Sequence, residues 1–194
     1  MLSPDSQVSQ FITPEQVYER LMRTRQGHEI EDTLARMLSS WTCGEGALPD
    51  WLGLTEENFL RMMQKHFPSF DASELVNPNI PLDLARMDEV EDLRKLLLQS
   101  CPDKDESKLW MLDILIAGCL GSDHLWQDLG LWERADLSKL MQQNFAALAE
   151  RNVKDMKWKK FLYKQLCEAE GIYTCRAPSC EVCKDYDVCF GPED

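Results

Sequence analysis

The chain has 194 residues, of which 44% are hydrophobic, and a formal net charge of −13 at pH 7. This length predicts one compact domain, or one domain with an appendage, that is large enough to bury a core. A chain this acidic is a poor match for proteins that bind nucleic acid or membrane surfaces, so we expect neither as a partner. The start of the chain lacks the pattern of a secretory leader, and the longest apolar run, 109–120, is too short to cross a bilayer. These features favour a cytoplasmic protein.

Helical patterns follow one another along the chain, and no stretch shows the alternation expected of half-buried strands. The first helix should begin at the capping signal Thr13-Pro14 and run to about residue 26. The second has an apolar face that recurs at helical spacing from Ile30 to Trp41. Further helices are predicted at about 55–67, 88–100, 107–120, 124–129, 133–151 and 155–170. We therefore predict an all-α fold, a bundle of about seven helices with a C-terminal cysteine-rich metal-binding loop.

The helix at 107–120 is apolar almost all round, which predicts a central position in the bundle. We expect three segments: a variable N-terminal segment with the first helix (1–28), a helical domain (29–171) and a cysteine-rich tail that binds a cluster (172–194). Within the helical domain, Leu-Gly-Leu at 52–54 and at 129–131 precedes similar helical patterns. The similarity predicts an internal repeat of 30–68 and 107–146 with a period of roughly 77 residues. Convergence on the same helix-ending glycines is the alternative explanation.

Four of the eight cysteines fall within fifteen residues near the C-terminus: Cys175, Cys180, Cys183 and Cys189. Their spacing is C-x4-C-x2-C-x5-C, and thiolates in one short loop can converge on a metal ion or an iron–sulfur cluster. Structural zinc sites usually consist of two C-x2–4-C pairs joined by a longer stretch, and the second pair is absent from this segment, which favours a cluster. A zinc ion and a redox-active dithiol remain the alternatives from spacing alone.

Basic residues and histidines provide further candidates. Five lysines precede the cysteine segment: Lys154, Lys157, Lys159, Lys160 and Lys164. Their ordinary interpretation is a solvated helix face, whereas the functional one is attraction of an oxyanion or an acidic partner, with Lys157 and Lys160 as candidates. His124 is a candidate metal ligand or a helix cap. His66, near a helix end, suits a cation at the negative end of the helix dipole, and His28 gives no signal.

Several segments of the chain resemble the NifQ family of nitrogen-fixation proteins. They include Gly44-Glu-Gly-Ala-Leu-Pro49, His66-Phe-Pro68, the stretches 124–131 and 155–160, and the cysteine segment with its C-x4-C-x2-C-x5-C spacing. The resemblance implies a molybdenum–iron–sulfur cluster held by Cys175, Cys180, Cys183 and Cys189. It also implies a molybdenum donor for biosynthesis of the iron–molybdenum cofactor of nitrogenase. The implied partners are molybdate and the scaffold and reductase proteins of nitrogenase cofactor assembly.

The sequence contains no Ser–His–Asp signature, glycine-rich phosphate loop or HExxH motif, so it makes no positive case for a hydrolase or a kinase. We therefore expect a metal carrier rather than an enzyme. Two other classes of protein remain as alternatives. One is an electron-transfer protein with an ordinary iron–sulfur cluster, and the other is a helical interaction module stapled by zinc.

Overall fold

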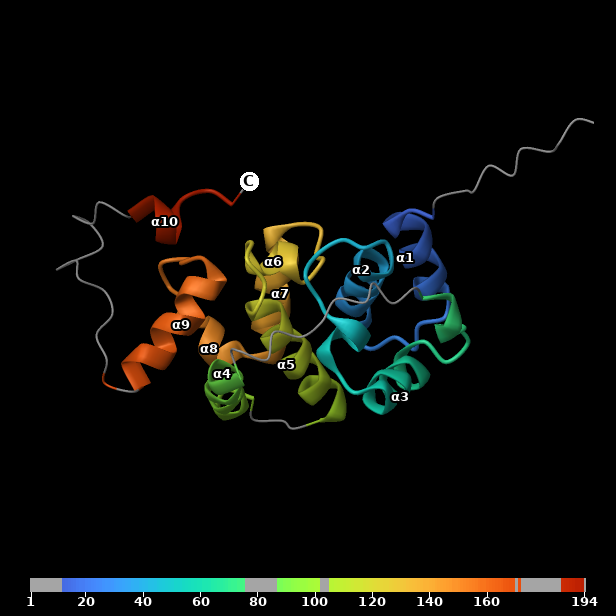
Figure 1. Cartoon of the computed structure of the whole chain (residues 1–194), viewed down its shortest axis with the longest axis horizontal. Coiled ribbons are helices and arrows are strands. Elements are labelled where there is room, and N and C mark those ends of the chain that lie inside the picture. The colour runs from blue at the N-terminus through green and yellow to red at the C-terminus, as the bar shows by residue number, and fades with distance from the viewer. Residues whose placement is uncertain (1–11, 76–86, 102–104, 170, 172–185, 194) are drawn as a thin grey trace, which may run out of the picture.

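The structure is a computed structural model that describes residues 12–75, 87–101, 105–169, 171 and 186–193 (Figure 1). Within these ranges the regular elements are all helices, which confirms the all-α prediction for this part of the chain. The α-helices are α1 Pro14–Arg23, α2 Glu31–Thr42, α3 Glu56–His66, α4 Met87–Gln99, α5 Glu106–Cys119, α6 Leu125–Asp128, α7 Arg134–Asn144, α8 Ala146–Ala149, α9 Trp158–Ala169 and α10 Tyr186–Phe190. Two short 3-10 helices span Asp50–Gly53 and Ala72–Glu74.

The predicted number of helices, about seven, was too low, because the described ranges contain ten α-helices. The helix expected at 133–151 is divided into α7 and α8, since the backbone of Phe145 leaves the helical region at φ −136° and ψ 46°. A further short helix, α10, lies in the segment that was expected to be a loop. The greater part of the predicted cysteine-rich loop, 172–185, lies outside the described residues.

Helix α5 lies in the core of the bundle, where it packs against α3 and α4 (Figure 1). Buried apolar side chains lie on most sides of the helix, and Met111, Leu112 and Ile114 are completely buried. The helix begins at Asp105, whose carboxylate accepts a hydrogen bond from the backbone N–H of Ser107 and so caps the first turn. The predicted central position is therefore confirmed. No helix in the described ranges is both long enough and apolar enough to cross a membrane.

Helices α1 and α2 form a second packed unit. Thr13 and Gln16 form a capping box at the start of α1, as the Thr-Pro signal predicted. The Tyr18 hydroxyl in α1 then donates a hydrogen bond of 2.7 Å to Oδ1 of Asp32 in α2. The guanidinium of Arg36 forms an ion pair with the same carboxylate at 3.5 Å. This polar cluster fixes how the two helices are rotated against each other.

Two glycines with positive φ bring the N-terminal and C-terminal parts of the bundle into close contact. A Cβ atom on Gly53 (φ +84°) would lie 2.6 Å from Cβ of Ala117 in α5. A Cβ atom on Gly130 (φ +68°) would lie 2.8 Å from Cβ of Ser40 in α2. The two glycines are 77 residues apart in the sequence, and their contact partners, Ser40 and Ala117, are also 77 residues apart. This separation equals the period of the proposed repeat, so each contact joins a glycine of one repeat to the helix of the other. The internal repeat remains a proposal, which this reciprocal packing supports.

Candidate functional site

Three of the four predicted thiol ligands, Cys175, Cys180 and Cys183, lie outside the described residues. The fourth, Cys189, belongs to α10, where it is half-buried and packs against the hydrophobic core beside Phe190. Figure 1 shows α10 near α9, at the end of the bundle opposite α1. The described residues therefore locate the last cysteine of the segment on the folded bundle.

Lys157, which directly precedes α9, holds α10 through two hydrogen bonds. Its backbone N–H donates to the carbonyl oxygen of Cys189 at 2.8 Å, and its ammonium donates to the carbonyl oxygen of Asp187 at 3.1 Å. The Asp187 carbonyl also accepts a backbone hydrogen bond of 2.9 Å from Gly191 at the end of α10, where a cation is stabilised by the helix dipole. Lys157 therefore fixes the backbone of the last predicted ligand.

Glu193, which follows α10, is held by two side chains of the helical domain. Its own side chain is 4% exposed; Oε2 lies 3.2 Å from Nε of Arg134, and Oε1 lies 3.7 Å from Nδ1 of His124. Arg134 also donates two hydrogen bonds, of 2.6 and 2.9 Å, to the carboxylate of Asp155, and these raise the pKa of the guanidinium. At 3.7 Å the Glu193 carboxylate faces the imidazole of His124 without a hydrogen bond, so it contributes negative charge next to that ring.

His124, Lys157 and Lys160 line one open cavity of about 770 Å³. Val188 of α10, next to Cys189 in the sequence, and Glu193 complete the wall on the C-terminal side. The loop between α5 and α6 and the start of α9 supply most of the rest: Gly121, Ser122, Asp123, Leu125, Gln127, Lys159 and Tyr163. The structure thus brings the three predicted residues to the helix that carries Cys189. Their roles as a metal ligand and as oxyanion contacts remain predictions.

Lys159 is part of the cavity wall rather than of a solvated face. Its ammonium donates hydrogen bonds of 2.8 Å to the carbonyl oxygens of Gly121 and Asp123, and it pairs with the carboxylate of Asp128. The Asp128 side chain is 2% exposed, so Lys159 neutralises a carboxylate that water scarcely reaches. These bonds close the loop that leads into His124 and so position the imidazole.

Lys160 differs from its neighbours. Its side chain is exposed, and no hydrogen bond or ion pair joins it to another described residue. Lys157 also lines the cavity, but its ammonium is engaged with the carbonyl group of Asp187. Lys160 is therefore the cationic side chain of this wall that is best placed to meet an anion from solution.

Sequence reasoning missed Asp128, Arg134 and Glu193 as parts of this site. Asp128 follows His124 by four residues within the stretch 124–131. This proximity to a candidate histidine is a signal that could have identified it. Arg134 and Glu193 carry no comparable signal, because their pairing joins residues that lie far apart in the sequence.

The side chains at this end of the molecule fit a thiolate-held metal centre. Cys189 would supply a soft ligand to the predicted centre, and His124 and Glu193 line the neighbouring cavity. Among the described residues, these three side chains do not form a group whose ligand atoms all lie within 4.8 Å of one another. Lys157, Lys160 and Arg134 provide positive charge at this end of the molecule, which would offset the negative charge of thiolates in the predicted centre. The described residues thus include one predicted cysteine ligand and basic side chains near it, and the three other predicted ligands lie outside the described residues.

Comparison with known proteins places the chain among proteins of one family. Residues 33–191 match the NifQ family. The chain is 45% identical over 173 residues to protein NifQ of Azotobacter vinelandii, which covers 82% of this chain and 87% of that protein. It is 30% identical over 160 residues to protein NifQ of Rhodobacter capsulatus, with coverage of 82% and 87%. A NifQ homolog of Sinorhizobium fredii is 35% identical over 167 residues, with coverage of 81% and 68%. No solved structure matches the chain.

Proposed function

The chain belongs to the NifQ family, and on this premise we propose that it carries molybdenum for biosynthesis of the iron–molybdenum cofactor of nitrogenase. In this proposal Cys175, Cys180, Cys183 and Cys189 hold a molybdenum–iron–sulfur cluster as cargo. The recipients are the scaffold and reductase proteins of cofactor assembly, in the cytoplasm. The observation that carries the proposal is the set of four thiols within fifteen residues, all inside the matched region 33–191.

The surroundings of Cys189 support a role in transfer. A carrier must accept and release its cargo, and the last cysteine lies on a helix beside an open cavity of about 770 Å³. We assign Lys160 the attraction of molybdate, because it is exposed and unengaged by other described residues. The positive charge of Lys157 also attracts molybdate, while its ammonium holds α10 through the hydrogen bond to Asp187. His124, next to Glu193, is the candidate for an additional ligand.

Metal analysis of protein purified without oxygen from molybdate-supplied cells tests this proposal. We expect molybdenum, iron and sulfide together, and we expect all three to fall in a Cys183→Ala variant because one thiolate ligand is lost. Cys43→Ala is the matched control, since this half-buried cysteine precedes the segment by 132 residues in the sequence and contacts the carbonyl oxygen of Ile12. Unchanged molybdenum and iron in Cys183→Ala would show that the segment is not the site.

The same analysis separates the alternatives. Iron and sulfide without molybdenum would favour an electron-transfer protein. One zinc ion per chain that is lost in Cys183→Ala, without iron, would favour a zinc-stapled interaction module. Transfer itself is tested by incubating the loaded protein with the apo assembly scaffold and reductase proteins. We expect molybdenum to leave this chain and co-purify with the recipient.

The assignment of Lys160 is tested by molybdate uptake at low and high ionic strength. We expect Lys160→Gln to reduce the initial rate several-fold at low salt, and Lys160→Arg to preserve it, because the effect depends on charge. Lys154→Gln, an exposed lysine outside the cavity, is the control. Equal rates for Lys160→Gln and Lys154→Gln would remove Lys160 from the proposal.

A further inference from the structure

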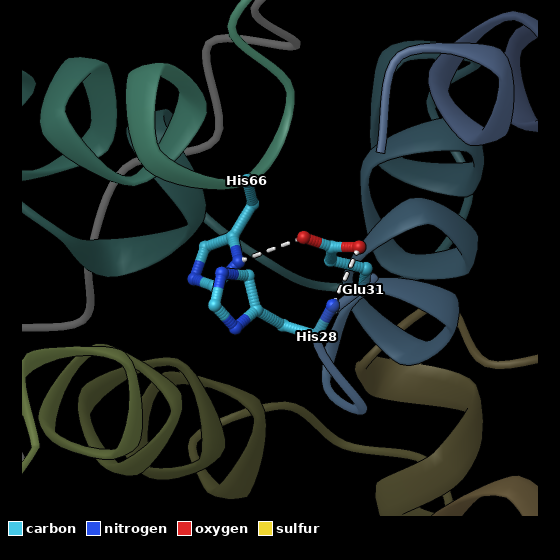
Figure 2. A group of neighbouring side chains, drawn as sticks. All are labelled: His28, Glu31 and His66. Carbon is cyan, nitrogen blue, oxygen red and sulfur yellow. Dashed lines mark hydrogen bonds and ion pairs between the residues drawn. The ribbon is translucent and has the colours of Figure 1, made fainter. Parts of the chain in front are cut away.

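A second group of side chains able to bind a metal lies in a different cavity. His28 precedes α2, Glu31 is the first residue of α2, and His66 is the last residue of α3 (Figure 2). Each offers one ligand atom, and these atoms all lie within 4.8 Å of one another. Figure 2 shows the two imidazole rings side by side with the carboxylate next to them. Two imidazoles and one carboxylate form a ligand set that borderline divalent metal ions prefer.

The Glu31 carboxylate is held rigidly by backbone groups. Oε2 accepts hydrogen bonds from the N–H groups of Gly27 at 2.7 Å and His28 at 3.0 Å, and Oε1 accepts one from Gln26 at 3.1 Å. The side chain is 1% exposed. These bonds orient Oε1 toward Nδ1 of His66, at a distance of 3.4 Å. The carboxylate is therefore preorganised, and its orientation does not depend on a metal.

The distance between Oε1 of Glu31 and Nδ1 of His66 is long for a hydrogen bond and suitable for two metal ligands. N–H···O bonds are typically about 2.9–3.0 Å long, whereas this contact is 3.4 Å. Two ligands that each lie about 2.05 Å from a tetrahedral zinc ion are about 3.3 Å apart. A zinc ion next to these two atoms thus needs little movement of either side chain.

The other ring nitrogen of His66 can hold the imidazole in the tautomer that metal binding requires. Nε2 lies 2.9 Å from Oγ of Ser107. If Nε2 carries the hydrogen and donates to Ser107, the lone pair of Nδ1 faces the carboxylate, and a cation between them would relieve the repulsion. If Ser107 donates instead, Nδ1 carries the hydrogen and bonds to Glu31. Burial lowers the pKa of His66, which favours the neutral ring in both arrangements.

His28 completes the group from the solvent side. Its ring packs edge-on against the ring of His66, with centroids 5.3 Å apart, and its side chain is exposed. Both histidines line a cavity of about 390 Å³, in which a coordination position not filled by protein is accessible. This cavity shares no lining residue with the one beside α10. His28 and Glu31 also precede the region 33–191 that matches the family.

We propose that His28, Glu31 and His66 bind one borderline divalent transition-metal ion, such as zinc, with a coordination position open to the cavity. The site is separate from the cysteine segment and adds a resident ion to a protein whose proposed cargo is bound elsewhere. The alternative is a hydrogen-bonded cluster that holds α2 against α3 without a metal.

Zinc binding to a full-length variant with serine at the four segment cysteines tests the proposal, since those thiols compete for zinc. The chain has three histidines, so ¹H–¹⁵N spectra resolve every imidazole. We expect one zinc per chain, with shifts at His28 and His66 and none at His124. Zinc should also raise the melting temperature of this variant, because it binds the folded state.

Variants of the exposed ligand identify the site without disturbing the buried carboxylate. His28→Ala and His28→Gln should each weaken zinc binding at least about tenfold, whereas Lys154→Gln, at an exposed residue outside this cavity, should leave it unchanged. In the chain with its cysteines intact, His28→Ala should lower the bound zinc by one ion per chain. The proposal is overturned if zinc leaves the His66 signals in place, or if the His28 variants bind zinc as tightly as their parent.

Discussion

The backbone N–H of Lys157 donates a hydrogen bond of 2.8 Å to the carbonyl oxygen of Cys189, so the start of α9 holds the last cysteine of the segment. Glu193 adds a second attachment three residues after α10, through Arg134 and His124. These attachments predict that α10 is a docked helix whose stability depends on a few polar contacts.

Replacement of Glu193 by Gln should loosen α10. The change removes a charge from a side chain that is 4% exposed and paired with Arg134. We expect deuterium exchange in peptides covering 186–193 to rise about tenfold, because the charge-assisted contact is lost. Exchange in α2 should not change. Glu168→Gln, which removes a surface pair with Lys164 in α9, is the control, and equal exchange in both variants would contradict the anchoring role.

Replacement of Lys159 by Met should destabilise the protein strongly. The Asp128 carboxylate would then be buried without its cation, and such a loss costs about 3 kcal/mol in the free energy of unfolding. Lys164→Met removes an exposed pair with Glu168 in the same helix and should cost less than about 0.5 kcal/mol. Urea denaturation of both variants measures the difference. Similar losses would mean that Lys159 is in effect a surface lysine.

Replacement of Gly53 by Ala should be more costly than the same change at Gly44. Both glycines have positive φ, for which an alanine costs about 1 kcal/mol, but a Cβ atom at Gly44 meets nothing within 4 Å. At Gly53 the new Cβ would lie 2.6 Å from Cβ of Ala117, so we expect a total loss of about 3 kcal/mol.

A second substitution separates the steric clash from the backbone strain. Ala117→Gly removes the atom that Gly53→Ala would meet, so the double variant should be more stable than the sum of the single losses predicts, by about 1–2 kcal/mol. The same Ala117→Gly change combined with Gly44→Ala should be additive. Additivity in both pairs would show that Gly53 does not contact α5 closely.

The contact between α1 and α2 should weaken in acid. Burial raises the pKa of Asp32, but the hydrogen bond from Tyr18 and the charges of Arg36 and Lys139 outweigh it, so its pKa lies below the ordinary 3.8. A carboxyl group whose pKa is lower in the folded state stabilises the fold at neutral pH, and this stabilisation is lost as the pH falls below about 4. Urea denaturation between about pH 5 and pH 3 should therefore show a steeper loss for the parent than for Asp32→Asn. Parallel curves would contradict the assigned pKa.

Most of the helices could be predicted because their apolar spacing is local information. The faces of α2 and α5 were visible in the sequence, and so was the end of α3, which Pro68 marks. The break between α7 and α8 was not, because Phe145 is followed by good helix formers. The Phe145 side chain is fully buried. The break therefore coincides with tertiary packing, which a local sequence pattern does not report.

The candidate site could be predicted in its residue types but not in its pairings. The spacing of the cysteines and the positions of His124 and Lys160 were sufficient to select them. The pairing of Lys159 with Asp128 joins distant segments, so the lysine was interpreted as solvated. His66 does end α3, as expected, but it is 1% exposed and burial lowers its pKa, which disfavours the cation that the helix end would suit.

The docking of α10 also changes the chain entropy of metal binding. A free C-terminal tail would have to close a loop each time its thiols gathered around a metal, and the entropy lost in closing a loop grows with the logarithm of its length. Here Ala169 ends α9 on one side of the cysteine segment, and Cys189 is fastened to the bundle on the other. Folding of the bundle has thus already closed the loop, so loading and unloading of the proposed cargo need not repeat that entropic step.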